Sequence, residues 1–506
     1  MRTFEWLLWL FTLGWAVTWA IRLHYKRAQT LLWTLSLVIV VLHLAIEGWR
    51  SQMVATYAIL GLLLGHSLFL QKLNQRPKRW AQVGRGVAVV AAIGIAGALP
   101  LLFPVFSYAK PVGAFAIGTA EYELRTPIQN RDLAFQAWYP IAPGTKGSPV
   151  RISSHPELLE VAYSSLTGLP QPLFDHLRLI KTHAIANAPL SVDHDRFPIV
   201  LFSHGPGSAN RSQSLFQMEA LASCGFIAIA IDHTGYASTT IFPDGHTVPL
   251  ASDFSWPAIV DRRSTDMLRT WVADVRAVID QLEMLNEHDP SGLLTGRLDL
   301  SRIGYLGASF GGSVVVQALL DEPRIRAGVA QDGKPYFSDD TLTRLRRPLL
   351  YMQSAAPYIK TSEAQLAKWG LTPAAFRMAE QDHYVRQMQL FAASGGPIYD
   401  VYIRRTNHVT FSDLDLIIGL PDSQLMNIRR AHKIINDYTL AFFEQYLNGT
   451  PEALVDGHTP SPYEEVTVAS RNVVNSTPMA SGQKRSSGIF EQPAGMKQVQ
   501  TKSQEQ

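Results

Sequence analysis

The first part of the chain contains four long apolar stretches, at 4–21, 31–46, 53–70 and 87–106. Each approaches the roughly 17–25 residues that a helix needs to cross a bilayer. The stretch at 31–46 is the shortest and contains His43. Because the first stretch is followed by others and lacks a small-residue cleavage site, it does not resemble a cleaved signal peptide. The pattern predicts a transmembrane helical region of about four spans in residues 1–110.

From residue 121 the pattern changes to short β-rich runs that alternate with helical stretches. Strands are predicted at 133–139, 199–203 and 226–231, and helices at 212–223 and 266–285. Alternating strands and helices indicate a mostly parallel sheet covered by helices. We therefore expect an α/β domain over 121–450, with its chemistry at the carboxyl ends of the strands. The segment 465–506, rich in Ser, Gln, Lys and Gly, is predicted to be a disordered tail.

Charge and cysteine content exclude several classes of protein. Lys and Arg number 45 against 42 Asp and Glu, a net charge of +3, and no long basic tract follows the apolar region, so nucleic acid is not an expected partner. The single cysteine, Cys224, excludes an intrachain disulfide framework, and we interpret it as a buried structural thiol. No metal cluster, phosphate-binding glycine loop or dinucleotide fingerprint is present in the sequence, so neither a metal nor a cofactor is expected.

The basic residues between the apolar stretches predict an orientation. The first and third connections are basic; they contain Arg22, Lys26, Arg27, Lys72, Arg76, Lys78, Arg79 and Arg85. The second connection has only Arg50, beside Glu47. The positive-inside rule places the basic connections in the cytoplasm, so four spans would leave the α/β domain outside it. Arg2 argues mildly for the reverse, as would a stretch at 31–46 that does not span. With only Glu5 and His43 near the apolar runs, a pure anchor is the preferred role.

A glycine-rich turn contains the strongest chemical signal. The strand-like run 302–306 leads into Gly307-Ala308-Ser309-Phe310-Gly311-Gly312, and a helical stretch follows at 313–320. A G-x-S-x-G sequence between a strand and a helix is typical of the nucleophile elbow of the α/β-hydrolase fold, which exposes the serine hydroxyl above the sheet. The pattern therefore predicts that fold, with Ser309 as the nucleophile.

A serine nucleophile needs a histidine base and an orienting acid, which follow it in that fold in the order Ser, Asp or Glu, His. Asp332 comes directly after the strand-like run 325–331, and His408 follows the run 398–403, expected to be the last strand. Asp339 and Asp340 are alternative acids, but they lie in a polar loop and fit a helix N-cap better. His383, beside Asp382 in a predicted helix, is interpreted as structural. The predicted triad is Ser309, Asp332 and His408.

Several runs resemble the platelet-activating-factor acetylhydrolase family of the plasma and type II intracellular kind. They are 133–140, 198–205, 219–235, the elbow, 332–333, 405–412 and the helical stretch 434–448, in order along most of 121–450. The resemblance implies a membrane-anchored, bacterial-type member, a calcium-independent esterase that removes short or oxidised acyl chains from glycerophospholipids. It implies the same triad. Bacterial relatives are broader carboxylesterases, so the resemblance specifies ester hydrolysis more closely than the ester.

The sequence departs from that family at the predicted oxyanion hole. Phe310, after the nucleophile, can provide one backbone N–H donor. The family's second donor is the residue after His-Gly, which here is Pro206 and has no N–H. Either the loop has shifted so that Gly207 donates, which we favour, or the hole lacks one donor. His204 is interpreted as a residue that braces this loop.

Two questions of function stay open at the level of sequence. Amphipathic helices predicted at 361–369 and 373–391 fit a lid or acyl-pocket wall and fit a peripheral insertion equally well. The preferred function is hydrolysis of a lipid or small ester at the outer face of a membrane. A serine peptidase and a non-catalytic membrane sensor with a hydrolase-like domain are the alternatives. The sequence predicts no oligomeric state.

Overall fold

The computed structural model describes residues 1–20, 26–73, 79–125, 131–207, 209–254, 264–334, 345–356, 363–368, 370–419 and 423–471. Within these residues one sheet of 11 strands has the order β13-β12-β11-β10-β9-β5-β6-β2-β1-β4-β3. Its strands are β1 (Ala116–Leu124), β2 (Leu133–Ile141), β3 (Pro149–Arg151), β4 (Lys181–Ala186), β5 (Phe197–Ser203), β6 (Ile227–Asp232), β9 (Leu298–Ala308), β10 (Ile325–Gln331), β11 (Leu349–Ala356), β12 (Ile398–Asn407) and β13 (Val466–Arg471). A separate small hairpin consists of β7 (Thr239–Ile241) and β8 (Thr247–Pro249).

The centre of the sheet is parallel and is covered by helices on both faces. Strands β6, β5, β9, β10, β11 and β12 pair in parallel in that order. The helices of this part are α5 (Pro156–Thr167), α6 (Leu215–Ser223), α8 (Ser264–Glu287), α9 (Phe310–Asp321), α11 (Glu363–Lys368), α12 (Pro373–Ala393), α13 (Leu414–Ile417) and α14 (Ile428–Phe443). These observations confirm the predicted α/β-hydrolase architecture.

Alternation along the buried strands divides the core into two layers. In β5, Val200 and Phe202 pack with α6 and α14, whereas Ile199 and Leu201 pack with α8 and α9. A strand covered on both faces must be apolar at consecutive positions, which explains the continuous hydrophobic run in the sequence. Each side chain buried in this way contributes about 1.5–3 kcal/mol of transfer free energy.

Strand β13 corrects two predictions from the sequence. Val466–Arg471 pairs antiparallel with β12. The disordered tail predicted from residue 465 therefore includes six residues that form a strand, and β12, which was expected to be the last strand, is followed by β13. The run Val-Thr-Val-Ala-Ser-Arg is short, and its backbone hydrogen bonds come from β12, more than 60 residues away in the sequence. Residues 472–506 lie outside the described residues.

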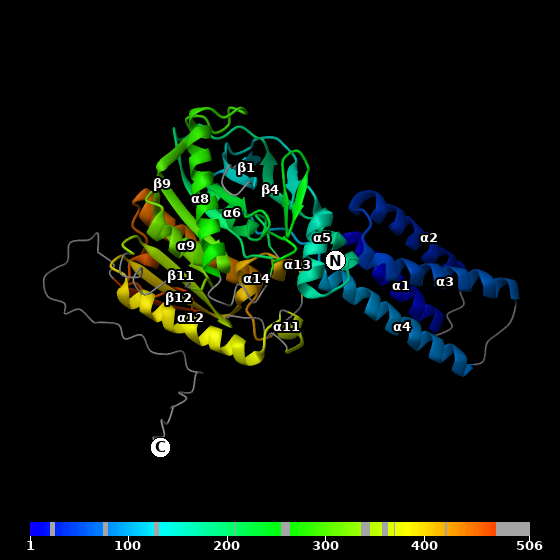
Figure 1. The fold of residues 1–506 in the computed structure, drawn as a ribbon. Coiled ribbons are helices and arrows are strands. Elements are labelled where there is room, and N and C mark those ends of the chain that lie inside the picture. The colour runs from blue at the N-terminus through cyan, green and yellow to red at the C-terminus, as the bar shows by residue number, and fades with distance from the viewer. Residues whose placement is uncertain are drawn as a thin grey trace, which may run out of the picture.

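The N-terminal helices form a bundle beside the sheet domain (Figure 1). They are α1 (Thr3–Ala20), α2 (Lys26–Leu42) with a π-helical turn (His43–Glu47), and α3 (Val54–Leu73) after a 3₁₀ turn (Ser51–Met53), followed by α4 (Arg79–Leu102). Most exposed large hydrophobic side chains of the described residues lie on these helices. By length and composition one described helix, Thr30–Glu47, could cross a membrane, whereas the apolar parts of the other helices of the bundle, Thr3–Val17, Ser51–Gly65 and Gly86–Leu102, are shorter. Arg22, Arg76 and Lys78, which support the predicted orientation, lie outside the described residues.

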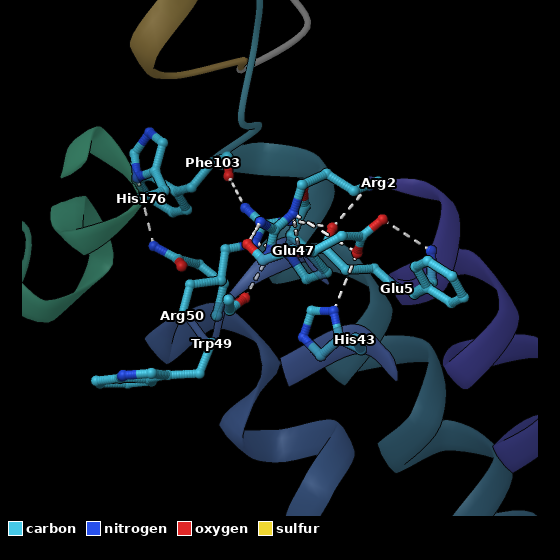
Figure 2. A network of polar contacts seen from close by, with 12 residues as sticks. Arg2, Glu5, His43, Glu47, Trp49, Arg50, Phe103 and His176 are labelled. Carbon is cyan, nitrogen blue, oxygen red and sulfur yellow. Dashed lines mark hydrogen bonds and ion pairs between the residues drawn. The ribbon is translucent and has the colours of Figure 1, made fainter. Parts of the chain in front are cut away.

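Buried charges gather at the end of the bundle that faces the sheet domain (Figure 2). Arg50 Nε and Nη2 donate to the two carboxylate oxygens of Glu5, each at 2.7 Å, and Arg2 Nε donates to Glu5 Oε1 at 3.0 Å. His43 Nδ1 lies 3.0 Å from Glu47 Oε2. The possible ligand atoms of Glu5, His43 and Glu47 lie within 4.8 Å of one another. Since the two arginines balance the charges of the two acids, we interpret this group as an ion-pair cluster.

The same end of the bundle docks on the sheet domain through a 3₁₀ segment, η4 (Gln171–Leu179). Ser51 N donates to Asp175 Oδ2 at 2.8 Å, and Gln52 Nε2 donates to Leu173 O at 2.7 Å. On the other side of η4, His176 Nε2 lies 3.2 Å from Ile417 O in α13. The bundle is therefore joined to the segment that follows His408 in the chain.

Candidate active site

The sharp turn at Ser309 depends on two glycines. Ser309 has φ 59° and ψ −126°, between the end of β9 and the first residue of α9. A β-carbon on Gly307 would lie 2.3 Å from the carbonyl carbon of Gly311, and one on Gly311 would lie 2.1 Å from Ser203 O. Only glycine fits at either position, because the turn is pressed against its own helix and against the end of β5. Such a backbone conformation costs about 1–3 kcal/mol, and it presents the hydroxyl at the carboxyl edge of the sheet.

The three residues predicted as a triad form one hydrogen-bonded chain. His408 Nε2 lies 3.0 Å from Ser309 Oγ, and His408 Nδ1 lies 3.2 Å from Asp332 Oδ2. Asp332 comes directly after β10, and His408 directly after β12 in a 3₁₀ turn, η5 (His408–Phe411), which Asn407 caps by accepting from Thr410 N. The imidazole is thus aimed at the hydroxyl from one side and held by the carboxylate on the other, the arrangement that lets a histidine take a proton from serine.

Two of the other residues considered from the sequence, His383 and Cys224, are described by the structure and fit structural roles. His383 is buried on α12, and burial lowers its pKa to about 3, which suits a neutral structural ring. Asp339 and Asp340 lie outside the described residues. Cys224 caps the C-terminus of α6 and is only partly buried, and desolvation raises the pKa of its thiol, which lowers its reactivity.

The structure contradicts the prediction that Gly207 donates to the oxyanion. Gly207 N donates to Tyr236 O at 2.7 Å, in a turn where Gly207 has φ 79°. An N–H committed to a backbone carbonyl is not available to a substrate oxygen. Phe310, by contrast, is the first residue of α9, at the end of a helix where N–H groups point outward along the axis.

His204 braces the loop that follows β5, as predicted. His204 Nε2 accepts from His233 N at 3.2 Å, so Nδ1 carries the proton and donates to Gly205 O at 2.7 Å. Burial lowers the pKa of His204, which keeps this neutral tautomer.

Sequence reasoning missed a second Ser-His-Asp chain beneath this loop. Ser203 Oγ lies 2.8 Å from His233 Nε2, and His233 Nδ1 lies 2.8 Å from Asp274 Oδ2. All three are buried, and Arg131 donates to the same carboxylate. Burial raises the pKa of Asp274 to about 7 and holds that of His233 well below its usual range. Without access to solvent this chain supports the loop and is not a second active site.

Two further side chains at the site carry no signal in the sequence. Ser354, in β11, donates to Asp332 through its backbone N at 2.8 Å and its Oγ at 2.5 Å. Gln213, just before α6, accepts from Gly205 N at 2.8 Å through Oε1. A serine in a strand and a glutamine in a loop are common, and only their positions in space distinguish them.

Helix α12 is fixed at its C-terminal end. Leu390 and Phe391 are buried in the core, and the ring of Phe391 lies 5.5 Å from that of Tyr351 in β11. Nearer its N-terminus, Phe376 lies 5.9 Å from the ammonium group of Lys334, two residues after Asp332. These contacts favour a wall beside the site over a lid that moves as a whole.

Comparisons with known proteins show the family to which the chain belongs. The family model described as platelet-activating factor acetylhydrolase, isoform II, matches residues 173–266 and 263–449. A platelet-activating factor acetylhydrolase of Cavia porcellus is 25% identical over 292 residues, which cover 53% of this chain and 61% of the relative. The corresponding protein of Canis lupus familiaris is 29% identical over 195 residues, covering 35% of this chain and 44% of the relative.

Two other similar proteins have esterase names. A probable 1-alkyl-2-acetylglycerophosphocholine esterase of Arthroderma benhamiae is 32% identical over 168 residues, covering 32% of this chain and 39% of the relative. A solved ferulic acid esterase of Streptomyces cinnamoneus has a TM-score of 0.54 and 25% identity, covering 72% of this chain and 99% of that one. The matches to the curated relatives named here span between 39% and 61% of those proteins' lengths.

Proposed function

Because the chain belongs to the platelet-activating factor acetylhydrolase isoform II family, we propose that it is a serine carboxylic ester hydrolase. The observation that carries the proposal is the hydrogen-bonded chain from Ser309 through His408 to Asp332 at the carboxyl edge of the parallel strands. The names of the similar proteins agree with it.

The geometry supports a two-step mechanism through an acyl-enzyme. His408 Nε2 takes the proton of Ser309 Oγ as that oxygen attacks the acyl carbon, and Asp332 stabilises the imidazolium that forms. The Phe310 N–H donates to the developing oxyanion. His408 then gives the proton to the leaving alcohol as the ester bond breaks. In the second step His408 activates a water molecule, which releases the acid and restores Ser309.

For the substrate we propose esters with short or oxidised acyl chains, including those of glycerophospholipids. Three of the named relatives, those of Cavia, Canis and Arthroderma, are acetylhydrolases or an esterase of a 2-acetyl glycerophosphocholine. The site needs no metal for this chemistry, since all proton transfers fall to the triad.

We further propose that the bundle anchors the enzyme as a multi-pass membrane protein, with its catalytic domain outside the cytoplasm. The exposed apolar side chains on α1, α2, α3 and α4 support contact with lipid, because soluble proteins rarely expose large apolar patches. The positive-inside rule supports the orientation. A reporter fused to the C-terminus of the full chain should then be active only outside the cytoplasm, and cytoplasmic activity would contradict this arrangement.

The function is tested with the purified full-length protein in detergent. The substrates are p-nitrophenyl esters of increasing chain length, a 2-acetyl phospholipid and a p-nitroanilide. We expect turnover of short esters and of the phospholipid, reduced on the order of 10⁴-fold or more by Ser309→Ala. Ser301→Ala, at an exposed serine of β9, is the control. Turnover of the anilide alone would indicate a peptidase, and no Ser309-dependent turnover would indicate a sensor.

A further inference from the structure

We propose that the side-chain amide of Gln213 supplies the second hydrogen-bond donor of the oxyanion hole. The inference rests on the proposed ester hydrolysis and adds a catalytic residue to it. It starts from a deficit at the loop after β5: Pro206 has no N–H, and the N–H of Gly207 is bonded to Tyr236 O at 2.7 Å. Neither residue of this loop can therefore provide a backbone donor.

The side chains of Gln213 and Ser309 lie beside the same glycine, Gly205. A β-carbon built on Gly205 would stand 3.5 Å from Ser309 Oγ and 3.8 Å from Gln213 Nε2. Ser309 Cβ would lie nearer still, at 3.2 Å, so the nucleophilic oxygen and the amide nitrogen border the same face of this glycine, where a side chain would crowd the nucleophile. A substrate carbonyl oxygen placed between them would come within reach of Nε2, as a donor requires.

The orientation of the Gln213 amide follows from its hydrogen bond. Gly205 N can only donate, so the group that faces it at 2.8 Å is Oε1. The opposite group, Nε2, carries two N–H donors. Within the described residues the hydrogen bonds of Gln213 run through Oε1 and the backbone, which leaves these donors for the site.

The backbone of Gln213 is fixed on both sides. Its N donates to Asn210 O at 2.9 Å, and its O accepts from Asp413 N at 2.9 Å. The next residue, Ser214, donates through Oγ to Phe411 O at 2.8 Å, in the same 3₁₀ turn that begins with His408. The donor and the base are therefore held by one hydrogen-bonded unit, and a preorganised donor is what oxyanion stabilisation needs.

Gln213→Glu separates this role from simple bracing. The glutamate keeps an oxygen to accept from Gly205 N but replaces the donor with a carboxylate oxygen. If Gln213 donates to the oxyanion, kcat for p-nitrophenyl acetate should fall on the order of 10²–10³-fold with KM little changed. Affinity for a trifluoromethyl ketone, a mimic of the tetrahedral intermediate, should fall in parallel. The pH profile of kcat, measured for both proteins, shows whether the new charge acts by shifting the base instead.

A rescue experiment provides the second test. Pro206→Leu restores a backbone N–H at residue 206, so it should raise kcat in a Gln213→Met protein and leave kcat level or lower in the wild type. Gln389→Glu, at an exposed glutamine of α12, is the matched control, and thermal unfolding shows whether each variant is folded.

The outcomes distinguish the two proposals. Ester turnover of Gln213→Glu equal to the wild type, or a large increase in kcat for Pro206→Leu alone, would overturn the role of Gln213 and leave the esterase intact. If the kcat of Gln213→Glu returns to the wild-type value at a shifted pH optimum, the proposed role of Gln213 is also overturned. Absence of Ser309-dependent turnover in the wild type would overturn the proposed function and this inference with it.

Discussion

At the scale of single residues, Ser354 decides how firmly the acid of the triad is held. Its N and Oγ donate to the two oxygens of Asp332 at 2.8 and 2.5 Å, and His408 Nδ1 shares the second oxygen at 3.2 Å. We expect Ser354→Ala to lower kcat about tenfold with KM little changed, because a hydrogen bond to a charged group contributes about 1.5–3 kcal/mol. Steady-state kinetics with a short p-nitrophenyl ester measures the effect.

Ser301→Ala again serves as the control for serine removal. A kcat for Ser354→Ala within twofold of the wild type would mean that the backbone N–H of Ser354 positions the carboxylate by itself.

At the scale of elements, Asp413 joins three segments around the base. Its Oδ2 accepts from Tyr108 Oη at 2.8 Å, in the connection after α4, and from Leu215 N at 3.0 Å, at the start of α6. Burial raises the pKa of Asp413 from 3.8 to about 8. The folded protein therefore binds the proton of the Asp413 carboxyl group more tightly than the unfolded chain does. The stability that this proton contributes is complete below about pH 4 and is lost as the pH rises to about 8.

Asp413→Asn should remove that dependence, because a neutral amide can accept the same two hydrogen bonds and does not titrate. We expect the thermal midpoint of the wild type to fall, relative to that of the variant, between about pH 4 and pH 8. Asp195→Asn, at an exposed aspartate, is the control. A difference between wild type and Asp413→Asn that stays constant over this range would contradict a protonated Asp413.

At the scale of the whole molecule, the ion-pair cluster of Figure 2 lies next to the contact between the bundle and the catalytic domain. Arg50 binds Glu5 and donates to Phe103 O at the end of α4, and the adjacent Ser51 binds Asp175 of η4. Arg50→Met leaves the Glu5 carboxylate without its closest partner, so we expect a loss of about 3 kcal/mol in the unfolding free energy of the bundle. A lower thermal midpoint in detergent would show it.

The double variant Glu5→Met with Arg50→Met should be closer to the wild type than Arg50→Met, since it leaves no unbalanced buried charge. Residual esterase activity after heating is a second measurement, because η4 contacts α13 after the turn that carries His408. Equal midpoints for wild type and Arg50→Met would show that the cluster does not stabilise the bundle.

The sequence by itself predicted the parallel core and the three residues that the structure joins in one hydrogen-bonded chain, Ser309, Asp332 and His408. Strand 325–331 was predicted with the bounds that the structure gives, and Asp332 follows it directly. This worked because hydrophobic patterns are local and because the fold repeats one rule: a strand ends, and a functional residue follows at the same edge of the sheet. The glycines around Ser309 are required by the sharp turn, since a β-carbon cannot fit there.

Only the tertiary structure decided which groups are already occupied and which are aimed at the site. The N–H of Gly207 is bonded to Tyr236, Gln213 Nε2 and Ser309 Oγ lie beside the same face of Gly205, and β13 pairs with β12. Each of these facts joins positions far apart in the chain, and each depends on the direction of a single N–H or side chain. Residue type and spacing do not encode such directions, because the free energy that selects them comes from partners that only folding brings within hydrogen-bonding distance.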